Sequence, residues 1–411
     1  MRTCAALLTA LPLCCLGAET SVGAGGEAVS ASELVCVTGG TGYVASVLLK
    51  ALLADPRGLR VRATVREGTM ARGAGSAWAQ DALWKHERLE LRRADLLDAA
   101  AMEVALRGCS VVHHTASPFP AAVPPGMEEM MLLAPALDGT QNVLRAARRG
   151  GARRVVVTSS TAAVTAQHPP LGNGGRNAAG AKWSESDWNV DSRVHEGAYR
   201  YSKVLAEQAA WRFAAAEGGA HEPLPAGAEH GIAGGPGSEG AGGAGGEPAP
   251  AFSVVALNPS FVMGPPAIAR AAGTSVGLVK GMLDGVFSAG GSAGALPGGA
   301  CYGTVDVRDL AAAHIAAMDV AAAGGQRFVL SSERCSTQLE LAGAIKAEAA
   351  FAGWPLPTEE AKPHRTRAVY DAGRARRVLG IKLRPIQATL RDMALAMRDM
   401  GMAGPAQHVE L

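Results

Sequence analysis

The stretch that most constrains the fold reads LVCVTGGTGYVA and spans residues 34–45. A short apolar run, rich in β-branched residues, ends abruptly in glycines, and a helical pattern with one apolar face follows. Strand, glycine-rich turn and helix in this order are typical of the first βαβ unit of a dinucleotide-binding sheet. Gly39 and Gly42 would let the backbone turn tightly beside a pyrophosphate, and Ala45 is small enough for the helix to pack on the strand.

The same pattern also occurs in βα turns that bind no ligand, so the rest of the chain has to decide between the two. Strand and helix patterns continue to alternate up to residue 258 and become less regular beyond it. This alternation predicts an α/β fold, a Rossmann-type doubly wound parallel sheet, with a smaller C-terminal substrate-binding lobe. We expect an NADP-binding domain over residues 33–258 and mainly the lobe over residues 259–411.

Two segments are predicted to lie outside the folded core. Residues 1–32 combine one basic residue, a short apolar run and small residues, as a signal peptide does. An organelle-targeting leader or a misassigned start codon would look similar, so the destination stays open. Residues 217–250 are dominated by Gly, Ala, Pro and Glu, which predicts a disordered surface insertion. No stretch is long and apolar enough for a transmembrane helix.

Composition argues against several other classes of protein. The formal net charge is +2 and no long basic run is present, so we expect no nucleic-acid partner. Of the seven cysteines, three lie within the first 15 residues and four are widely scattered, without a Cys-x-x-Cys pair or the spacing of metal ligands, so we expect no metal. Cys36 falls in the first strand and is interpreted as a small apolar core residue.

The end of the second strand, residues 60–65, bears on the choice of cofactor. Proteins that bind NAD usually place Asp or Glu there to hold the ribose 2′-hydroxyl, whereas this chain has Arg66. A guanidinium suits a phosphate, so we expect NADPH, with Arg72 as a second charge. A solvated arginine at a strand end is the alternative, and the neighbouring Glu67 weakens the phosphate interpretation.

Further cofactor contacts are expected where the third and fourth strands end. Asp95 could accept a hydrogen bond from the adenine amino group or could cap the next helix. The small residues 115–117 would suit a backbone running beside the nicotinamide ribose. His113 and His114 point to opposite faces of their strand, so at most one can face the site. The predicted cofactor contacts are Thr38, Gly39, Gly42, Tyr43, Val44, Arg66, Asp95, Leu96, Thr115, Ser117, Tyr199, Lys203, Pro259 and Val262.

Three side chains fit the reduction of a carbonyl group. Tyr199 and Lys203 lie one turn apart on a predicted helix, and Ser160 closes the strand at residues 153–160. A hydride added to a carbonyl carbon leaves an oxygen that must be protonated, and a phenol is a poor acid until a nearby ammonium lowers its pKa. The serine hydroxyl would bind the carbonyl oxygen. A Tyr-x-x-x-Lys pair alone is common; the order of glycine turn, Ser, Tyr and Lys is the informative feature, and Tyr201 has no lysine one turn later.

Eight segments carry a resemblance to a known family: VTGGTGYVA (37–45), VRATVR (61–66), ADL (94–96), HTASP (114–118), VVVTSS (155–160), YRYSKVLAEQAAW (199–211), NPSFVMGP (258–265) and VDVRDLAAAH (305–314). They resemble the extended short-chain dehydrogenases/reductases, in the group of dihydroflavonol, cinnamoyl-CoA and fungal-type aldehyde/ketone reductases. The resemblance implies that Ser160, Tyr199 and Lys203 are the catalytic triad and that Arg66 contacts the 2′-phosphate. The resembling enzymes are mostly cytosolic, whereas residues 1–18 favour targeting.

The chain departs at three places from patterns found in the wider family. Pro135 stands where many short-chain enzymes have a fourth catalytic Asn, as in the nearer relatives, and Thr165 stands where flavonoid reductases carry a substrate-binding Asn. Residues 197–202 lack the Trp and Cys of the cinnamoyl-CoA reductase signature. We therefore expect a general aldehyde or ketone reductase with a small-molecule carbonyl or alcohol substrate, acting as a monomer or homodimer. An NAD-dependent nucleotide-sugar epimerase or sterol dehydrogenase, and a non-catalytic NADPH-sensing protein, are the alternatives.

Overall fold

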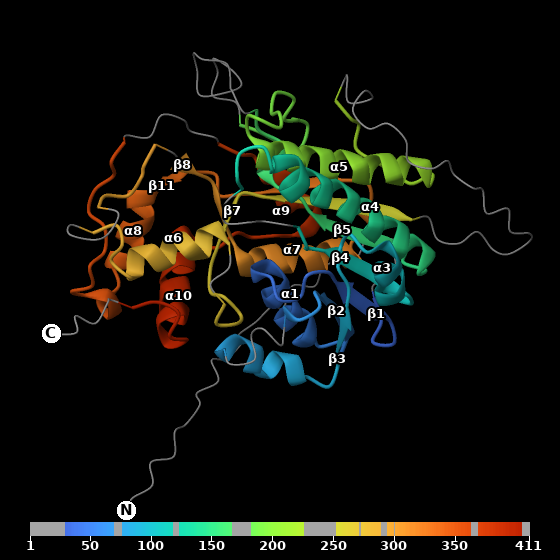
Figure 1. Cartoon of the computed structure of the whole chain (residues 1–411), viewed down its shortest axis with the longest axis horizontal. Helices are drawn as coiled ribbons and strands as arrows, with labels where there is room; N and C mark the ends of the chain where they lie inside the picture. Colours follow the sequence, from blue (N-terminus) through green and yellow to red (C-terminus); the bar gives the residue numbers. More distant parts are fainter. Residues whose placement is uncertain are drawn as a thin grey trace, which may run out of the picture.

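The computed structural model describes residues 29–69, 76–117, 123–166, 182–225, 252–270, 273–288, 294–299, 301–362 and 369–404. Its centre is a seven-stranded parallel sheet with the strand order β10-β6-β5-β4-β1-β2-β3 (Figure 1). The strands are β1 (Leu34–Val37), β2 (Arg60–Val65), β3 (Leu89–Arg93), β4 (Cys109–His114), β5 (Arg154–Thr158), β6 (Ser253–Pro259) and β10 (Arg327–Leu330).

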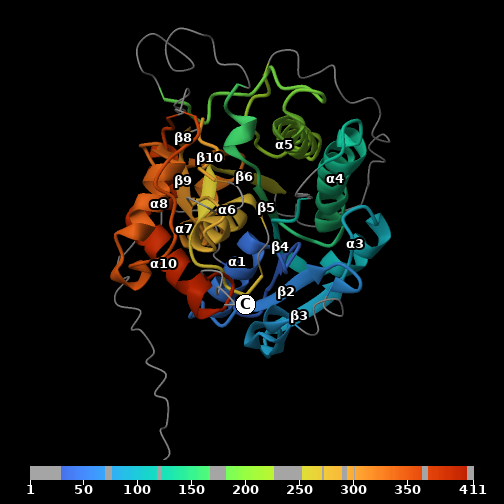
Figure 2. The ribbon, with the colours of Figure 1, turned by 60° about the vertical axis from the view of Figure 1, so that its left-hand side comes forward.

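Helices cover both faces of this sheet, which confirms the predicted doubly wound Rossmann-type fold (Figure 2). Side chains alternate between the faces, as β1 illustrates: Val35 packs in one core cluster and Cys36 in the other. Because both faces are buried, the central strands are apolar throughout. One face carries α3 (Ala99–Leu106), α4 (Ala134–Arg149) and α5 (Ala198–Ala216), and the other carries α1 (Tyr43–Leu53), α7 (Val307–Asp319) and α9 (Gly373–Leu379).

The strand order reverses between β1 and β4, and ligands of open α/β sheets bind in the crevice outside such a switch point. The glycine-rich turn follows β1, residues 115–117 follow β4, and Ser160 comes shortly after β5. These three strands are neighbours in the sheet, so their carboxyl ends lie side by side. The fold therefore brings together the segments that the sequence singles out.

A smaller lobe lies beside the sheet, at the left of Figure 1. Its helices α6 (Thr274–Leu283), α8 (Gln338–Lys346) and α10 (Ile386–Asp399) share a separate apolar cluster. Two short sheets connect it to the rest, one pairing β7 (Phe261–Met263) with β9 (Thr304–Asp306), the other β8 (Cys301–Tyr302) with β11 (Ser336–Thr337). Short 3₁₀ or π segments are Ala77–Gln80, Ala82–Lys85, Glu129–Leu133, Thr161–Ala163, Ala321–Ala323 and Ala349–Phe351.

The expected domain boundary at residue 258 is too simple. Strand β10 is the edge strand of the main sheet, where it pairs with β6, and α7 packs against α1. The chain therefore returns from the lobe to the main sheet, because the exposed edge of β6 and the apolar face of α1 both need a partner. Only part of residues 259–411 forms the lobe.

Two other expected boundaries also shift. Val29 is buried, and its N–H donates to the Asp319 side chain, so packing begins before residue 33. Residues 217–225 pack as well, since Glu222 forms an ion pair with Arg374 and the Trp188 indole donates to the Pro223 carbonyl. Residues 1–28 and 226–251, on which the expected leader and insertion mainly fall, lie outside the described residues.

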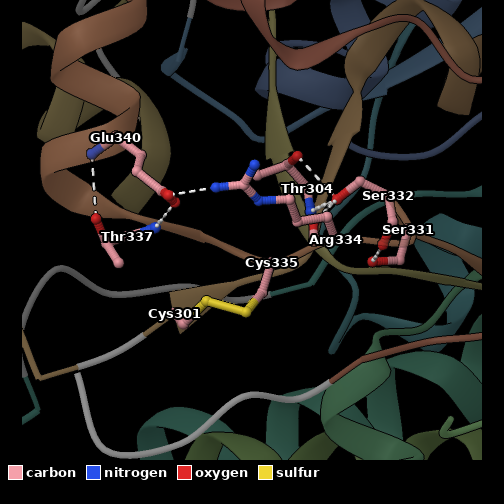
Figure 3. Close-up of a disulfide and its surroundings, with 8 residues drawn as sticks. All are labelled: Cys301, Thr304, Ser331, Ser332, Arg334, Cys335, Thr337 and Glu340. Carbon is pink, nitrogen blue, oxygen red and sulfur yellow. Dashed lines mark hydrogen bonds and ion pairs between the residues drawn. A yellow bond between two sulfur atoms is a disulfide. The ribbon is translucent and has the colours of Figure 1, made fainter.

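Four cysteines form two disulfides. Cys36 of β1 bonds to Cys109 of β4, so Cys36 is buried in the core as expected, as one half of a disulfide. Cys301 bonds to Cys335 in the lobe and ties β8 to the segment before β11 (Figure 3). That segment leads into a capping box at the start of α8, in which Thr337 and Glu340 bond each other's backbone N–H groups.

The described part of the chain contains neither a group of three or more metal-ligating side chains nor a helix with the length and hydropathy of a membrane span.

Candidate active site

The glycine-rich turn is shaped by close backbone approach. Gly39 has a φ of +71°, and a Cβ there would lie 2.8 Å from the Cβ of Ala116 after β4. Gly42 precedes α1 without a side-chain cap, so the first N–H groups of that helix are left for an anion. The turn is therefore narrow enough and donor-rich enough to hold a pyrophosphate, as predicted from the sequence.

Thr38 lies beneath this turn. Its side chain is fully buried, and its hydroxyl accepts the Ala116 N–H at 3.1 Å and bonds the His114 Nδ1 at 3.0 Å. The Thr115 hydroxyl donates to the Thr38 carbonyl at 2.6 Å. These bonds hold β1 against β4, so the Thr38 side chain supports the turn, and its contact with a cofactor stays a prediction. Ser117 is the last residue described before residue 123.

Tyr43, Val44 and Val262 connect the turn to the lobe. The Tyr43 hydroxyl donates to the Gly264 carbonyl at 2.7 Å, and burial raises its pKa well above the usual value. Val44 and Val262 are half-buried and pack against the same two apolar clusters. Pro259 ends β6 opposite Leu330 of β10. These predicted contacts lie where the sheet meets the lobe.

Two guanidinium groups lie near each other at the outer end of the turn. Arg66 directly follows β2 and is exposed. Arg270 donates to the Thr41 carbonyl at 2.7 Å, and burial, together with the nearby charge of Arg66, lowers its pKa. Sequence reasoning missed Arg270 because it is distant in the chain, and Arg72 lies outside the described residues. The two positive charges suit a phosphate group at this end of the cleft.

Asp95 and Leu96 occupy the turn before α3. Asp95 is exposed, and one carboxylate oxygen accepts the Leu97 N–H at 3.0 Å. The Leu96 carbonyl accepts from the Asn142 side chain at 2.9 Å. Asp98 is the N-cap of α3. Asp98, and not Asp95, therefore caps the helix, and the contact of Asp95 with the adenine amino group stays a prediction.

The three predicted catalytic residues come together after β5 and at the start of α5. The Ser160 hydroxyl is hydrogen-bonded to the Tyr199 phenol, and the Lys203 Nζ lies 5.9 Å from the centroid of the Tyr199 ring. Strand β5 ends at Thr158, so Ser160 is not the last strand residue but the N-cap of the short segment Thr161–Ala163. Its oxygen accepts the Ala162 N–H at 3.1 Å, which fixes the side chain at the mouth of the crevice.

Burial dominates the electrostatics of this group. It lowers the pKa of Lys203 to about 8, with the charge of Glu207 acting in the opposite direction. It also raises the pKa of Tyr199, against the smaller effects of the Ser160 hydrogen bond and of Arg200. Our prediction that the phenol has a lowered pKa is therefore wrong for this structure, because desolvation outweighs the nearby positive charges. A protonated phenol is the form that a proton donor requires.

His113 and His114 serve the core rather than the cleft. Burial lowers the pKa of each to about 3. The His114 ring bonds Thr38 and Thr140, and the His113 ring meets that of His314 with 3.3 Å between their Nδ1 atoms. Neither ring is placed to contact a substrate, and each stays neutral at physiological pH.

Two arginines, one half-buried and one fully buried, were not anticipated from the sequence. The half-buried Arg200, next to Tyr199, donates to the Thr165 hydroxyl at 2.7 Å and to the Ala166 carbonyl at 3.1 Å. Thr165 is buried, and its hydroxyl holds this loop through Arg200. Arg327 of β10 pairs with Glu207 of α5 at 2.6 Å, and both side chains are fully buried. Pro135, in the first turn of α4, is also buried.

Comparison with known proteins supports the same kind of site. Residues 39–193 match the family model described as NAD(P)H-binding. Tetraketide alpha-pyrone reductase 1 of Arabidopsis thaliana is 30% identical over 372 residues, 89% of this chain and 96% of that protein. Cinnamoyl-CoA reductase 2 of the same plant is 30% identical over 383 residues, 90% of this chain and 93% of that protein. The crystal structure of Gre2 with NADPH from Candida albicans is 26% identical, with a TM-score of 0.66, and the match covers 90% of this chain and 99% of that one.

The fold, the glycine-rich turn and these matches define an NAD(P)H-binding oxidoreductase. The chain belongs to the extended short-chain dehydrogenase/reductase family, in the group that includes cinnamoyl-CoA, tetraketide alpha-pyrone and anthocyanidin reductases. The family resemblance that the motifs indicated is thereby confirmed.

Proposed function

We propose that this protein is an NADPH-dependent reductase that converts an aldehyde or ketone into an alcohol. The observation that carries the proposal is the contact between Ser160 and Tyr199, with Lys203 one turn further along the same helix. The reductases to which the chain is similar favour this reaction class, and the departures at residues 165 and 197–202 argue against assigning one of their substrates.

Each of the three residues has a distinct chemical role in the proposal. The Ser160 hydroxyl donates a hydrogen bond to the substrate carbonyl oxygen and orients it. The Tyr199 phenol gives its proton to that oxygen as negative charge develops on it. Lys203, whose pKa of about 8 leaves it mostly protonated at neutral pH, stabilises the phenolate that remains. Bound NADPH supplies the hydride that reaches the carbonyl carbon.

The preference for NADPH over NADH rests on Arg66 and Arg270. A 2′-phosphate between two guanidinium groups would gain charge-assisted hydrogen bonds that a 2′-hydroxyl cannot make to the same degree. The narrow turn at Gly39, where a Cβ would collide with Ala116, fits a pyrophosphate beside the backbone. The similar Candida albicans structure contains NADPH, which supports this preference.

A panel of aliphatic and aromatic aldehydes and ketones, offered with NADPH or NADH, tests the proposal. We expect cofactor absorbance to fall only when a carbonyl is present, and faster with NADPH. Purified protein that retains stoichiometric NAD and does not oxidise added NADPH would favour the epimerase alternative. Binding of NADPH without turnover of any substrate would favour the sensor alternative.

A further inference from the structure

A buried carboxylate lies one helical turn beyond the catalytic lysine. Tyr199, Lys203 and Glu207 follow one another at four-residue spacing, so they share one face of α5. The Glu207 side chain is fully buried, and four hydrogen-bond donors surround it. Its Oε1 accepts from Arg327 Nε at 2.6 Å and Trp211 Nε1 at 3.3 Å, and its Oε2 accepts from Ser159 Oγ at 2.5 Å and Asn258 Nδ2 at 2.7 Å.

The Oε2 atom of this carboxylate is connected to the catalytic serine through Ser159 and Asn258. Ser159 precedes Ser160 in the chain, and the Asn258 amide that donates to Glu207 also donates to the Ser160 carbonyl at 3.2 Å. The two serines are therefore held at two points, the Ser159 hydroxyl and the Ser160 carbonyl. Ser159 and Asn258 both donate to the Oε2 of Glu207, which belongs to the same helix as Tyr199.

On the Oε1 side, the Arg327 guanidinium supplies a charge opposite to that of the Glu207 carboxylate. Arg327 is fully buried and also donates to the carbonyls of Glu185 at 3.0 Å and Asp187 at 2.8 Å. Its guanidinium lies 3.7 Å from the centroid of the Trp188 ring. A buried carboxylate without such a partner would be strongly unfavourable. The pair therefore keeps a strong acceptor inside the core, where Ser159 and Asn258 can use it.

We propose that Glu207 is a positioning residue that fixes the Ser159–Ser160 peptide to helix α5, so that the Ser160 hydroxyl stays against the Tyr199 phenol. This inference rests on the proposed reductase function, since the Ser160–Tyr199 geometry matters for proton transfer. Glu207 does not touch the reacting atoms; it acts through Ser159 and Asn258. Its charge also opposes the effect of burial on the pKa of Lys203, which is consistent with a role in this site.

The decisive variants are Ser159→Ala and Glu207→Gln, alone and combined, with Trp211→Phe as the matched control. Trp211→Phe removes a donor from the same carboxylate, but on the side away from Ser160. We expect Ser159→Ala to lower kcat about tenfold, the size of one lost hydrogen bond in the transition state, while the NADPH Kd stays within about twofold. Trp211→Phe should leave kcat unchanged. The double variant Ser159→Ala/Glu207→Gln should be no slower than Glu207→Gln, because both substitutions act on the same hydrogen bond between Ser159 and Glu207.

Wild-type kcat in folded Ser159→Ala and Glu207→Gln would overturn the inference. If Glu207→Gln does not fold, Ser159→Ala decides alone, because it leaves the buried ion pair intact. A wild-type protein without carbonyl turnover would overturn the proposed function instead, and crystal structures of the same variants would then decide. We expect the Ser160 hydroxyl to leave Tyr199 in Ser159→Ala and to stay in Trp211→Phe; an unmoved Ser160 in both would contradict a positioning role.

Discussion

The two ends of the cleft treat positive charge in opposite ways. At the turn, the exposed Arg66 lies near a second cation, Arg270, so two like charges come together. At the end formed by Ser160, Tyr199 and Lys203, the cations Lys203 and Arg327 are buried. The Glu207 carboxylate pairs with Arg327, and its negative charge also acts on Lys203. The first arrangement brings two positive charges together, whereas the second pairs a buried positive charge with a buried carboxylate.

This difference suggests that the charges at the turn serve to bind the cofactor, whereas the buried charges serve to hold neighbouring side chains in place. Like charges near the surface cost little in water and gain much when a phosphate arrives. Buried charges cannot be left uncompensated, and once paired they hold their neighbours in one arrangement. We therefore expect substitutions at the turn to change cofactor affinity and choice, and substitutions at the catalytic end to change stability or turnover.

The largest effect should come from Arg327→Met, which leaves Glu207 buried without its countercharge. We expect the free energy of unfolding to fall by about 3–5 kcal/mol, measured by urea denaturation. In the double variant Arg327→Met/Glu207→Gln, the carboxylate charge is removed as well, and much of the loss should be regained. Equal loss in the single and double variants would mean that packing, rather than charge, explains the effect.

The next effect concerns pH. Burial lowers the pKa of His113 and His114 to about 3, and that of His314 well below its usual value, so the folded protein keeps all three neutral. The unfolded chain takes up protons at about pH 6.5, so this stability is present above that pH and is lost progressively as pH falls toward 3. We expect a loss of about 1 kcal/mol for each histidine between pH 7.5 and 5.5.

Urea midpoints at the two pH values measure this loss. His314→Gln should weaken the pH dependence, because it removes one of the three buried imidazoles. A pH dependence that is identical in the wild type and in His314→Gln would contradict the assignment.

A smaller effect is expected at the turn. Arg66→Ala and Arg270→Ala should each raise the Kd for NADPH by about 10–100-fold, the worth of a charge-assisted hydrogen bond, and change the Kd for NADH little. Fluorescence titration with both cofactors measures the two constants. Equal losses for NADPH and NADH would mean that the arginines contact the shared part of the cofactor.

The smallest effect is expected for an exposed ion pair, which can be compared with the buried pair of Arg327 and Glu207. Glu67 pairs with Arg93 at 3.4 Å, with side-chain exposures of 84% and 79%. Because water screens so exposed a pair, Glu67→Gln should leave the urea midpoint unchanged. A loss approaching that of Arg327→Met would refute the idea that burial, rather than pairing itself, sets the energetic scale.

Local features of this structure could be predicted from the sequence, and contacts between distant segments could not. The turn at Gly39 and the order Ser160, Tyr199, Lys203 follow from short patterns with a physical meaning. By contrast, Arg270 meets Thr41, 229 residues away, and Arg327 meets Glu207, 120 residues away. Nothing in either local sequence indicates the partner. The disulfides escaped prediction for the same reason.

The wrong pKa expectation for Tyr199 has a related cause. Spacing along a helix showed that Lys203 would be near, but the sequence carries no measure of how far both side chains are removed from water. Desolvation proved larger than the effect of the neighbouring charges. Burial is a property of the whole fold, so it became visible only when α5 was packed against the sheet.

In the proposed reaction, Tyr199 donates the proton, while the other residues around the glycine-rich turn hold the cofactor. A single-turnover measurement can separate these two roles, with Tyr199→Phe preloaded with NADPH and mixed with a carbonyl that the wild type reduces. We expect hydride transfer to slow by about 10²–10⁴-fold while the NADPH Kd stays within about twofold. Oxidation of the bound NADPH at the wild-type rate would show that Tyr199 is not the proton donor.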